Sequence, residues 1–322
     1  LSIFLVYGWY YHHNIGDDLF MEAFRHLFPN LDFTFTSRID ESLLADVDVV
    51  FFGGGSFLGD RPRITDKALE ILKTKKIFYI GVGIESNVHP THNQLMSLAK
   101  LVIIRSQSRL EQIKKININT IYAPDLVYML RDKVTQSSRQ AHSVLVVPNV
   151  SVLPSNSDAN WKHVSWNYFK SEMSQFLDGL VEEKYELKFV PFCRANQLDD
   201  QWTISELIGQ MSKRNSNYEI LEQVTNLHEV TSLFSKFEFV ITQRYHGIIL
   251  AEITNTPYIS IYHHDKLKSS NNNLGQFISY YATHKQQLID SLNTVLNTKN
   301  DLILPIETNI YETIQNAVLS LI

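Results

Sequence analysis

Residues 239–268 read FVITQRYHGIILAEITNTPYISIYHHDKLK, in which an apolar strand passes directly into a helix. Arg244 and His246 stand at this junction. In an open α/β sheet, ligands bind beyond the carboxyl ends of the strands. A helix that begins there offers backbone N–H groups and a positive dipole end to an anion. The stretch therefore predicts a parallel α/β sheet with an anion site at Arg244 and His246.

Short apolar runs, rich in β-branched and aromatic residues, recur along the chain and are typical of buried strands. The runs before residue 130 are SIFLV (2–6), DVVFF (48–52), KIFYIGVG (76–83), LVIIR (101–105) and TIYAPD (120–125). The runs after residue 140 are SVLVVPNV (143–150), ELKFVPF (186–192), FEFVITQ (237–243) and PYISIY (257–262). Segments with helical spacing, such as 17–28, 91–100 and 107–115, lie between them. This βαβ order predicts parallel sheets.

A polar segment at 131–142 separates the two series of runs and marks a domain boundary. We therefore predict an α/β protein of two Rossmann-like domains, residues 1–135 and 136–322. Their parallel sheets would face a central cleft in a GT-B-like arrangement, a type of site that favours small ligands. The segment 148–166 is too long for a passive turn, and we expect it to be a lid or a ligand-binding loop.

The composition limits the class of partner. The 322 residues are 44 % hydrophobic and 20 % charged, as is typical of a globular chain long enough for two domains. A formal net charge of -5 argues against a general nucleic-acid binder, which needs many cationic contacts to phosphates. Cys193 is the only cysteine, so the chain forms no internal disulfide and we expect a reducing compartment, the cytoplasm.

Membrane segments are not evident in the sequence. No run of about 18 apolar residues occurs, so we expect no membrane-spanning helix. The sequence begins at Leu1 without a methionine and enters an apolar run at once, which suggests a segment trimmed from a longer chain and leaves open a leader or anchor before it.

Two glycine-bearing turns follow strands in the first half of the chain. Their residues that we expect to contact a ligand are Asn14, Gly16, Asp17, Gly53, Gly54, Gly55 and Ser56. Backbone without side chains lets a ligand approach closely. For the first turn alone, a simple strand-to-helix turn with an aspartate cap is the favoured alternative. Neither turn matches GxGxxG, which disfavours nicotinamide or flavin chemistry.

Other residues at strand ends are open to two interpretations each. Arg105 ends the strand LVIIR, where its guanidinium would point to the ligand edge or form an ion pair at the sheet rim. Asp125 follows TIYAP, where it would cap a turn, the favoured interpretation, or orient a catalytic group. The consecutive aromatics Trp9, Tyr10 and Tyr11 would stack on a sugar ring or pack in the core, and at least one should face inward.

With these pieces in order, the chain resembles the polysaccharide pyruvyl transferase family, whose members move a pyruvyl group from phosphoenolpyruvate onto a sugar as a ketal. The motifs that carry the resemblance span most of the chain and are NIGDD (14–18), FFGGGSFL (51–58), YIGVGI (79–84), RSQS (105–108), PDLVYML (124–130) and VITQRYHGIILAEITNTPYISIYHHDKLKSS (240–270). The last is the most specific. Ser106 stands where family members often have aspartate, and Tyr245 where an aliphatic residue is common.

The resemblance implies an enzyme and assigns roles to particular residues. Arg244 matches the arginine that binds phosphoenolpyruvate, His246 the catalytic histidine, and Arg105 an arginine that contacts the donor. The N-terminal domain would then supply the acceptor side and part of the donor site. The partners would be phosphoenolpyruvate, as co-substrate, and a sugar or lipid-linked oligosaccharide acceptor, which would associate the protein with a membrane. No other cofactor is implied.

The chemistry independently suits these residue types. Guanidinium groups bind carboxylates and phosphates through bidentate, charge-assisted hydrogen bonds. Protonation of the enol carbon needs an acid that titrates near neutrality, as histidine does. Lys266 and Lys268 would neutralise the departing phosphate, or would form a solvated basic turn, and the two interpretations weigh equally. Neighbouring histidines such as His263 and His264 point to opposite faces of a strand, so we expect no metal site.

Three functional hypotheses follow from these observations. The first is the ketal-forming pyruvyl transferase of polysaccharide biosynthesis, acting on an exopolysaccharide or glycan precursor. The second is a nucleotide-sugar-dependent glycosyltransferase with two Rossmann-like domains. The third is a non-catalytic anion-binding relative. Fold alone does not decide among them, because two-Rossmann architectures support many chemistries.

Overall fold

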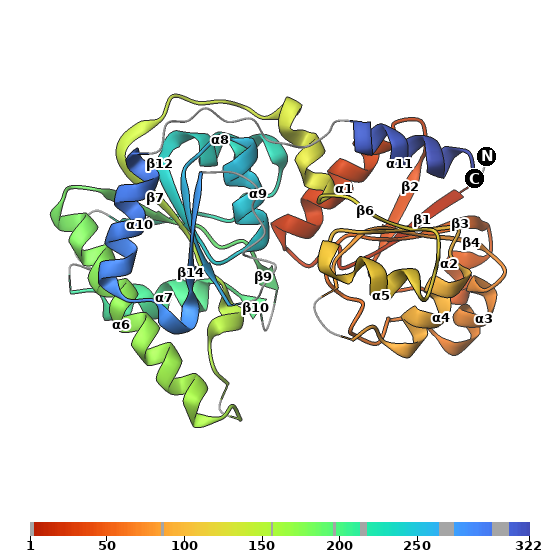
Figure 1. Ribbon diagram of the computed structural model, residues 1–322, viewed down its shortest axis with the longest axis horizontal. Coiled ribbons are helices and arrows are strands. Elements are labelled where there is room, and N and C mark those ends of the chain that lie inside the picture. Colours follow the sequence, from red (N-terminus) through yellow and green to blue (C-terminus); the bar gives the residue numbers. More distant parts are fainter. Residues whose placement is uncertain are drawn as a thin grey trace. The chain divides into compact units, whose positions relative to one another are not determined.

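The computed structural model describes residues 3–84, 87–155, 157–195, 198–212, 218–263, 274–297 and 309–322. The chain forms two compact units (Figure 1). Unit 1 contains residues Leu1–His12, Gly16–Asp132 and Ile306–Ile322, and unit 2 contains His13–Ile15 and Lys133–Pro305. The C-terminal helix thus packs in unit 1, although it is last in the sequence.

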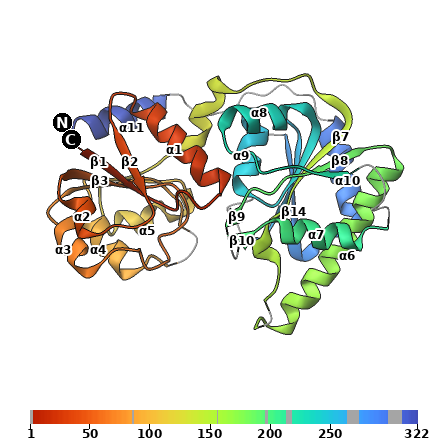
Figure 2. The ribbon, with the colours of Figure 1, turned by 180° about the vertical axis from the view of Figure 1, so that it is seen from behind.

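Unit 1 is a six-stranded parallel sheet covered by helices on both faces. Its strands are β1 (Ile3–Tyr7), β2 (Phe33–Thr36), β3 (Val47–Gly53), β4 (Lys76–Val82), β5 (Leu101–Ile104) and β6 (Thr120–Tyr122). Its helices are α1 (Ile15–Leu27), α2 (Glu41–Leu44), α3 (Asp66–Leu72), α4 (Pro90–Leu98), α5 (Leu110–Lys114) and α11 (Asn309–Leu319), with short 3₁₀ turns at Gln107–Arg109 and Leu126–Lys133. Helices α1 and α11 lie on one face of the sheet and α2 to α5 on the other (Figures 1 and 2).

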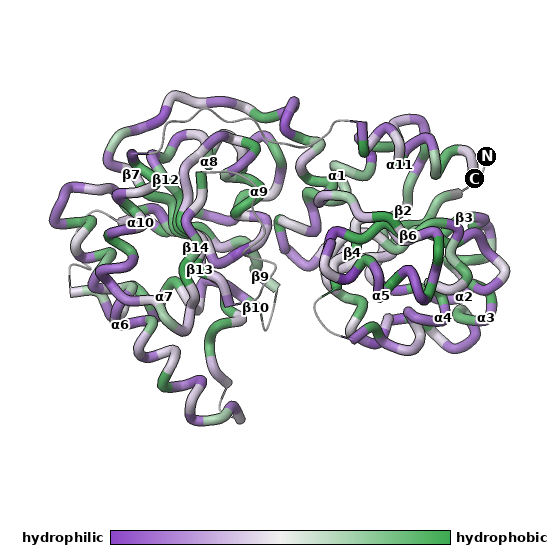
Figure 3. The backbone as a smooth tube through the Cα atoms, in the orientation of Figure 1, coloured by the Kyte–Doolittle hydropathy of each residue, from purple (hydrophilic) through white to green (hydrophobic). Residues whose placement is uncertain are grey.

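Successive side chains along the strands of unit 1 point to opposite faces of the sheet and pack into two separate cores. Phe51 of β3 faces α1 and packs edge-on against the ring of Phe24 at 5.3 Å. The next residue, Phe52, faces the opposite side and stacks on Tyr79 of β4 at 4.6 Å. Because both faces of a parallel sheet are buried, the strands read as continuous apolar runs rather than alternating ones. The apolar runs from which we predicted strands therefore form the hydrophobic strands at the centre of each sheet, as Figure 3 shows.

His92 of α4 lies in the second of these cores, although its polar and amphipathic surroundings in the sequence predict a surface residue. Its side chain is 0 % exposed, its Nδ1 lies 3.1 Å from the hydroxyl of Tyr79, and its ring packs edge-on against Phe52. Burial, with a smaller effect from His89, lowers the pKa of His92 to about 3. A charged ring would be poorly solvated at this buried position, where Nε2 finds no hydrogen-bond partner among the described residues.

The depressed pKa of His92 predicts that unit 1 loses stability in mild acid. Between the ordinary value of 6.5 and about 3, the unfolded chain binds a proton that the folded chain excludes. Stability should therefore fall as the pH falls below 6.5, by roughly 1.4 kcal/mol per pH unit, and no such loss should occur above it. Urea unfolding at several pH values from 7 to 5 measures this slope, and His92→Gln should flatten it. An unchanged slope in His92→Gln, or the same flattening in the exposed His228→Gln, would contradict the assignment.

Unit 2 is a second six-stranded parallel sheet with a small added hairpin. Its strands are β7 (Gln140–Val147), β8 (Glu186–Phe189), β11 (Tyr218–Ile220), β12 (Phe237–Thr242), β13 (Tyr258–Tyr262) and β14 (Gly275–Ser279), and the hairpin is β9 (Arg194–Ala195) with β10 (Leu198–Asp199). Its helices are α6 (Asn160–Glu182), α7 (Gln201–Gln210), α8 (Leu227–Lys236), α9 (Tyr245–Ile253) and α10 (Lys285–Asn297), with 3₁₀ turns at Val150–Val152 and Tyr280–Ala282.

One continuous core joins the sheet of unit 2 to helices α6, α7 and α10. Helices α8 and α9 lie on the other face (Figures 1 and 2). The prediction of a loop over 148–166 is partly wrong, because residues from Asn160 onward form the first turns of α6. Trp166 is buried in the core with Phe169, whereas Trp161 is 54 % exposed. The two tryptophans differ in exposure because positions five residues apart lie on different faces of the helix.

The strand orders place a switch point in each sheet. Unit 1 has the order β2-β1-β3-β4-β5-β6 and unit 2 the order β11-β8-β7-β12-β13-β14, with all neighbours parallel. The order reverses between β1 and β3 in unit 1, and between β7 and β12 in unit 2. Ligands of open α/β sheets bind beyond the carboxyl ends of the strands at such points. The predicted fold class, two Rossmann-like parallel-sheet units, is confirmed.

Candidate functional site

The junction of β12 and α9 lies at the switch point of unit 2. Arg244 is the N-cap residue of α9, with extended backbone at φ -107 and ψ 135, and His246 is the second residue of the helix. The hydroxyl of Thr242 accepts a hydrogen bond from the N–H of Arg244 at 3.0 Å, which fixes the turn. His246 is half-buried, and its ring lies edge-on to that of Tyr245 at 5.5 Å. The motif thus sits where the sequence predicted it.

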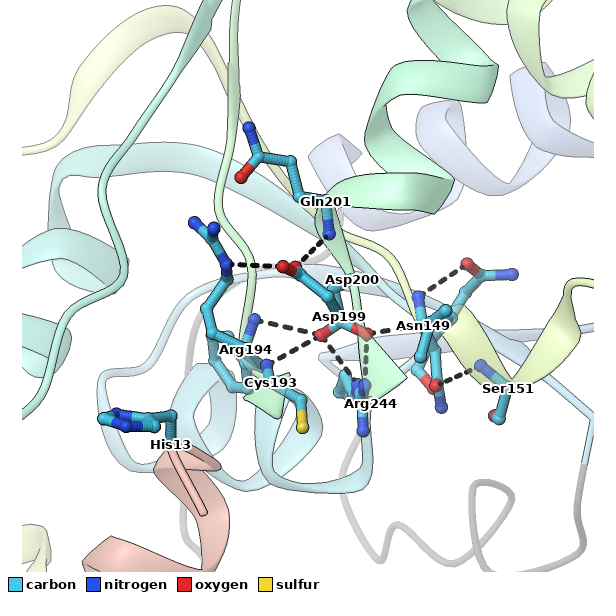
Figure 4. Close-up of polar contacts among 12 residues, drawn as sticks. His13, Asn149, Ser151, Cys193, Arg194, Asp199, Asp200, Gln201 and Arg244 are labelled. Carbon is cyan, nitrogen blue, oxygen red and sulfur yellow. Dashed lines mark hydrogen bonds and ion pairs between the residues drawn. The ribbon is translucent and has the colours of Figure 1, made fainter. Parts of the chain in front are cut away.

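The guanidinium of Arg244 is held by Asp200, a residue that the sequence did not single out. Nε donates to Oδ2 of Asp200 at 3.0 Å, and Nη2 donates to Oδ1. The carboxylate is 0 % exposed and also accepts the backbone N–H groups of Val150, Phe192 and Cys193. Figure 4 shows these contacts converging on Asp200. Five donors compensate a buried charge that would otherwise be costly to remove from water.

This pairing leaves one edge of the Arg244 guanidinium available. Asp200 occupies the edge formed by Nε and Nη2, and no hydrogen bond to Nη1 occurs within the described residues. The Nη1 and Nη2 edge has the fork geometry that suits a second carboxylate or a phosphate. The Arg244 side chain is 17 % exposed, so a ligand at this edge would be largely desolvated. Arg244 can therefore bridge Asp200 and an anion.

Asn149, which follows β7 across the switch point, completes the polar surroundings of Arg244. Its N–H donates to Oε1 of Gln243 at 3.1 Å, and its own Oδ1 accepts the N–H of Ser151 at 2.9 Å. These bonds tie the loop after β7 to the end of β12. Asn14 belongs to the same unit, where it pairs with Cys193 as an isolated β-bridge. The structure thus brings Asn14 to the segment that holds Asp200.

Gly247 is required for the geometry of the Arg244 turn, which gives a second prediction. A Cβ at Gly247 would lie 2.2 Å from Oγ1 and 3.0 Å from Cβ of Thr242, so the side chain that fixes Arg244 would have to move. We expect Gly247→Ala to lower the unfolding free energy by about 1–3 kcal/mol and to weaken anion binding at Arg244.

The control for Gly247→Ala is a glycine with free space. Gly179 lies within α6, and a Cβ there would meet nothing within 4 Å. Gly179→Ala should raise stability by about 0.5–1 kcal/mol through helix propensity. Urea unfolding of both variants checks the pair. Equal effects of the two substitutions would show that the Thr242 contact does not constrain the turn.

Arg105 follows strand β5 in unit 1, as Arg244 follows β12 in unit 2. Its Nη1 pairs with Oδ2 of Asp125 and its Nη2 donates to Oγ of Ser56 at 3.1 Å. The two charged side chains are 7 % and 0 % exposed, so the pair is buried and not a pair at the sheet rim. The other oxygen of Asp125 accepts the N–H of Val127, which caps the following turn. The interpretation of Asp125 as a cap is therefore confirmed, and its carboxylate also orients the guanidinium of Arg105.

The glycine turn after β3 packs against these residues. Gly54 and Gly55 have φ +68 and +66, and a Cβ on Gly54 would lie 2.7 Å from the ring of Phe20, so glycine is needed there. Asp17, 7 % exposed in the first turn of α1, lies next to Gly55, with Oδ1 3.3 Å from the place of a Cβ on that residue. The structure brings together Gly53, Gly54, Gly55, Ser56, Asp17 and Arg105 at the carboxyl edge of the unit 1 sheet.

Not every predicted site residue joins these two groups. Gly16 lies beside Asp17 in the first turn of α1. Lys266 and Lys268 lie outside the described residues. Ser106, in the place of an aspartate, accepts the N–H of Ile84 through Oγ at 3.1 Å. The convergence of Arg105 and Arg244 on one ligand stays a prediction, because each is described within its own unit.

Asp200 is the main residue that the sequence analysis missed. It stands in the run QLDDQWT before α7, a pattern that predicts a helix cap. In the structure it is the N-cap residue but makes no capping bond, and its side chain turns back to Arg244. A pair of aspartates before a helix was the only available signal, and it does not say which arginine they meet.

The fold defines a GT-B-like α/β protein. At the carboxyl edge of each sheet lies an arginine that is paired with a buried aspartate. The family model described as polysaccharide pyruvyl transferase matches residues 14–265. The chain belongs to this family, whose name implies a transferase. A search of curated proteins finds no match.

Solved structures with the same fold include UDP-GlcNAc 2-epimerases. The enzyme from Methanocaldococcus jannaschii superposes with a TM-score of 0.65 at 11 % identity, covering 100 % of both chains. The enzyme from Neisseria meningitidis, bound to UDP-GlcNAc, gives 0.60 at 10 % identity and covers 99 % of this chain and 100 % of its own. At such identities the likeness shows the fold alone. Among the described residues, no helix has both the length and the apolar content to cross a membrane.

Proposed function

We propose that this protein transfers the pyruvyl group of phosphoenolpyruvate onto two hydroxyls of a sugar in a polysaccharide or glycan precursor, forming a ketal and releasing phosphate. The observation that carries the proposal is the Arg244 guanidinium, fixed by Asp200 on one edge and offering its other edge beside His246 at the switch point of unit 2. A small dianion with a planar carboxylate suits such an edge.

The atoms balance without a resident cofactor. C3 of the enol takes a proton and becomes the methyl group, while C2 forms a bond to one sugar oxygen, whose proton leaves. The bond between C2 and the phosphate oxygen then breaks and inorganic phosphate departs. A second sugar hydroxyl adds to C2 and loses its proton, which closes the ring. No electron is gained or lost.

The residues of this chain supply binding and proton transfer. Arg244 would hold the carboxylate or phosphate of the donor through Nη1 and Nη2, which fixes the enol beside the helix. His246, two residues on, would give the proton to C3. Arg105, oriented by Asp125 and Ser56, would make a second cationic contact to the donor. Lys266 and Lys268 would offset the charge of the leaving phosphate.

Phosphate release tests the proposal. The intact chain is mixed with phosphoenolpyruvate and a panel of galactose- and mannosamine-type acceptors, and phosphorus NMR follows inorganic phosphate and the loss of the enol phosphate signal. Release that depends on both the donor and a sugar is the expected result. Failure across the panel by a folded protein would count against pyruvyl transfer.

Donor choice separates this proposal from the nucleotide-sugar alternative. Several solved structures of the same fold contain UDP or UDP-GlcNAc, so that ligand is the natural comparison. Phosphoenolpyruvate should raise the melting temperature by mass action, and UDP-GlcNAc should not. The reverse result would favour a glycosyltransferase, and a shift with phosphoenolpyruvate but no turnover would favour a non-catalytic relative. We place the reaction in the cytoplasm, at a membrane where the acceptor is lipid-linked.

A further inference from the structure

The loop that follows β1 is held in an unusual backbone conformation. Among the described residues, five that are not glycine have positive φ. Lys184 and Asn255 each follow the end of a helix and are typical helix-terminating residues. His142 lies at the bulge where β7 shifts register against β12. The remaining two, Tyr11 at φ 63 and His13 at φ 53, have no such explanation.

Contacts within unit 1 hold the loop on both sides of Tyr11. Tyr10 is 0 % exposed, and its hydroxyl donates to the carbonyl of Gly53 at 2.6 Å. Trp9 stacks on the ring of His12, with centroids 4.7 Å apart and planes at 22°. Tyr11 itself is 62 % exposed. An exposed turn in this conformation favours glycine or asparagine. A tyrosine at this position therefore indicates that its ring has a functional role.

We propose that Tyr11, together with the stacked Trp9 and His12, forms a platform for the apolar face of a pyranose ring, the acceptor sugar. The inference rests on the proposed function for the identity of the ligand. The loop lies at the carboxyl end of β1, at the switch point of the unit 1 sheet, and Tyr10 ties it to the glycine turn at Gly53. Aromatic rings bind the C–H face of a sugar through large, well-defined contact area, while its hydroxyls stay at the rim.

Other exposed aromatics lack this combination of features. Trp161 and Tyr168 are 54 % and 46 % exposed, but both lie on the regular helix α6. Trp161 packs on Tyr281, which follows β14, but neither of these two residues has positive φ. Tyr168 has no positive φ and does not lie at the carboxyl end of a strand, so it serves as the control for exposed aromatic area alone.

Tyr11→Gly provides the sharpest test, because it removes the ring and relieves the left-handed conformation together. We expect the KM for the sugar to rise about tenfold, the KM for phosphoenolpyruvate to stay unchanged, and the urea midpoint to stay equal or rise. Tyr11→Phe keeps the platform and should retain the KM of the wild type. Tyr168→Ala, the matched control, should change neither constant. An acceptor KM that is unchanged in Tyr11→Gly, or raised equally in Tyr168→Ala, overturns the platform.

A binding measurement separates this inference from the proposed reaction. Saturation-transfer NMR with methyl β-galactopyranoside and with N-acetylmannosamine reports sugar protons that touch the protein. Transfer to at least one of them should be clear in the wild type and lost in Tyr11→Gly. Transfer without any phosphate release would refute pyruvyl transfer and leave the platform standing. Absence of transfer to both sugars, or equal transfer in the two proteins, would refute the platform.

Discussion

Replacing His246 with alanine is expected to lower the rate of phosphate release from phosphoenolpyruvate by about 10²–10⁴-fold, the usual contribution of a positioned general acid. His246 lies in the first turn of α9, two residues after the Arg244 guanidinium. Its side chain is half-buried and is not needed for the core, so the fold should survive the change. Steady-state kinetics should show the loss in kcat, with little change in the KM for the donor.

The companion variant and the control sharpen this test. Arg244→Lys keeps the charge but loses the second edge of the guanidinium, and it should raise the KM for phosphoenolpyruvate more than it lowers kcat. His228, exposed on α8 of the same unit, provides the matched histidine control, and His228→Ala should have wild-type kinetics. Wild-type kcat in His246→Ala would remove the histidine from the chemistry and leave only an anion-binding role for the junction.

The fold was predictable because buried parallel strands have an unmistakable pattern. Runs such as VDVVFFG of β3 are apolar on both faces, and the helical segments between them leave little choice of architecture. Short strands gave no comparable signal. β2 has only four residues and β11 three, and the pairing that makes them strands comes from their neighbours in the sheet. The return of α11 to unit 1 likewise depends on tertiary contacts, such as that of the Tyr311 hydroxyl with the carbonyl of Asp125.

The site was predictable only in part, for a reason visible in Arg244 and Arg105. Both positions could be predicted from the local order of elements, since each arginine closely follows a strand at the carboxyl edge of its sheet. Their partners do not, because Asp200 is 44 residues before Arg244 and Asp125 is 20 residues after Arg105. Only the folded sheet brings these charges together. The position of a buried arginine can thus be predicted from the sequence, whereas the carboxylate that orients it cannot.

Both units orient an arginine with a buried aspartate, although their strand orders differ. In each, an arginine at the carboxyl edge is oriented by an aspartate that is at most 1 % exposed and that also accepts backbone N–H groups. The aspartate neutralises the arginine, so a donor dianion at either position meets a directed hydrogen-bond edge rather than an excess of charge. Geometry would therefore select the ligand more than net attraction does, which suits a chain whose formal net charge is -5.

Asp200→Asn is expected to be the most destabilising single change, lowering the unfolding free energy by about 3–5 kcal/mol. The substitution turns one acceptor oxygen into a donor facing N–H groups, and it leaves Arg244 largely buried without its counter-charge. Asp199→Asn is the matched control, because Asp199 pairs with Arg194, whose side chain is 40 % exposed. A partly exposed pair of that kind contributes about 0–1 kcal/mol, so urea unfolding should separate the two neighbours clearly.

A double variant distinguishes the structural role of Asp200 from its role in positioning Arg244. Arg244→Met with Asp200→Leu removes both charges and should recover much of the lost stability, because replacing a buried pair with apolar side chains is often neutral. It should not recover binding of phosphoenolpyruvate, since the guanidinium edge is gone. Recovery of donor binding in the double variant would show that the anion is held elsewhere. Failure of Asp200→Asn to lower stability would show that the five-donor carboxylate is not the anchor of this edge of the sheet.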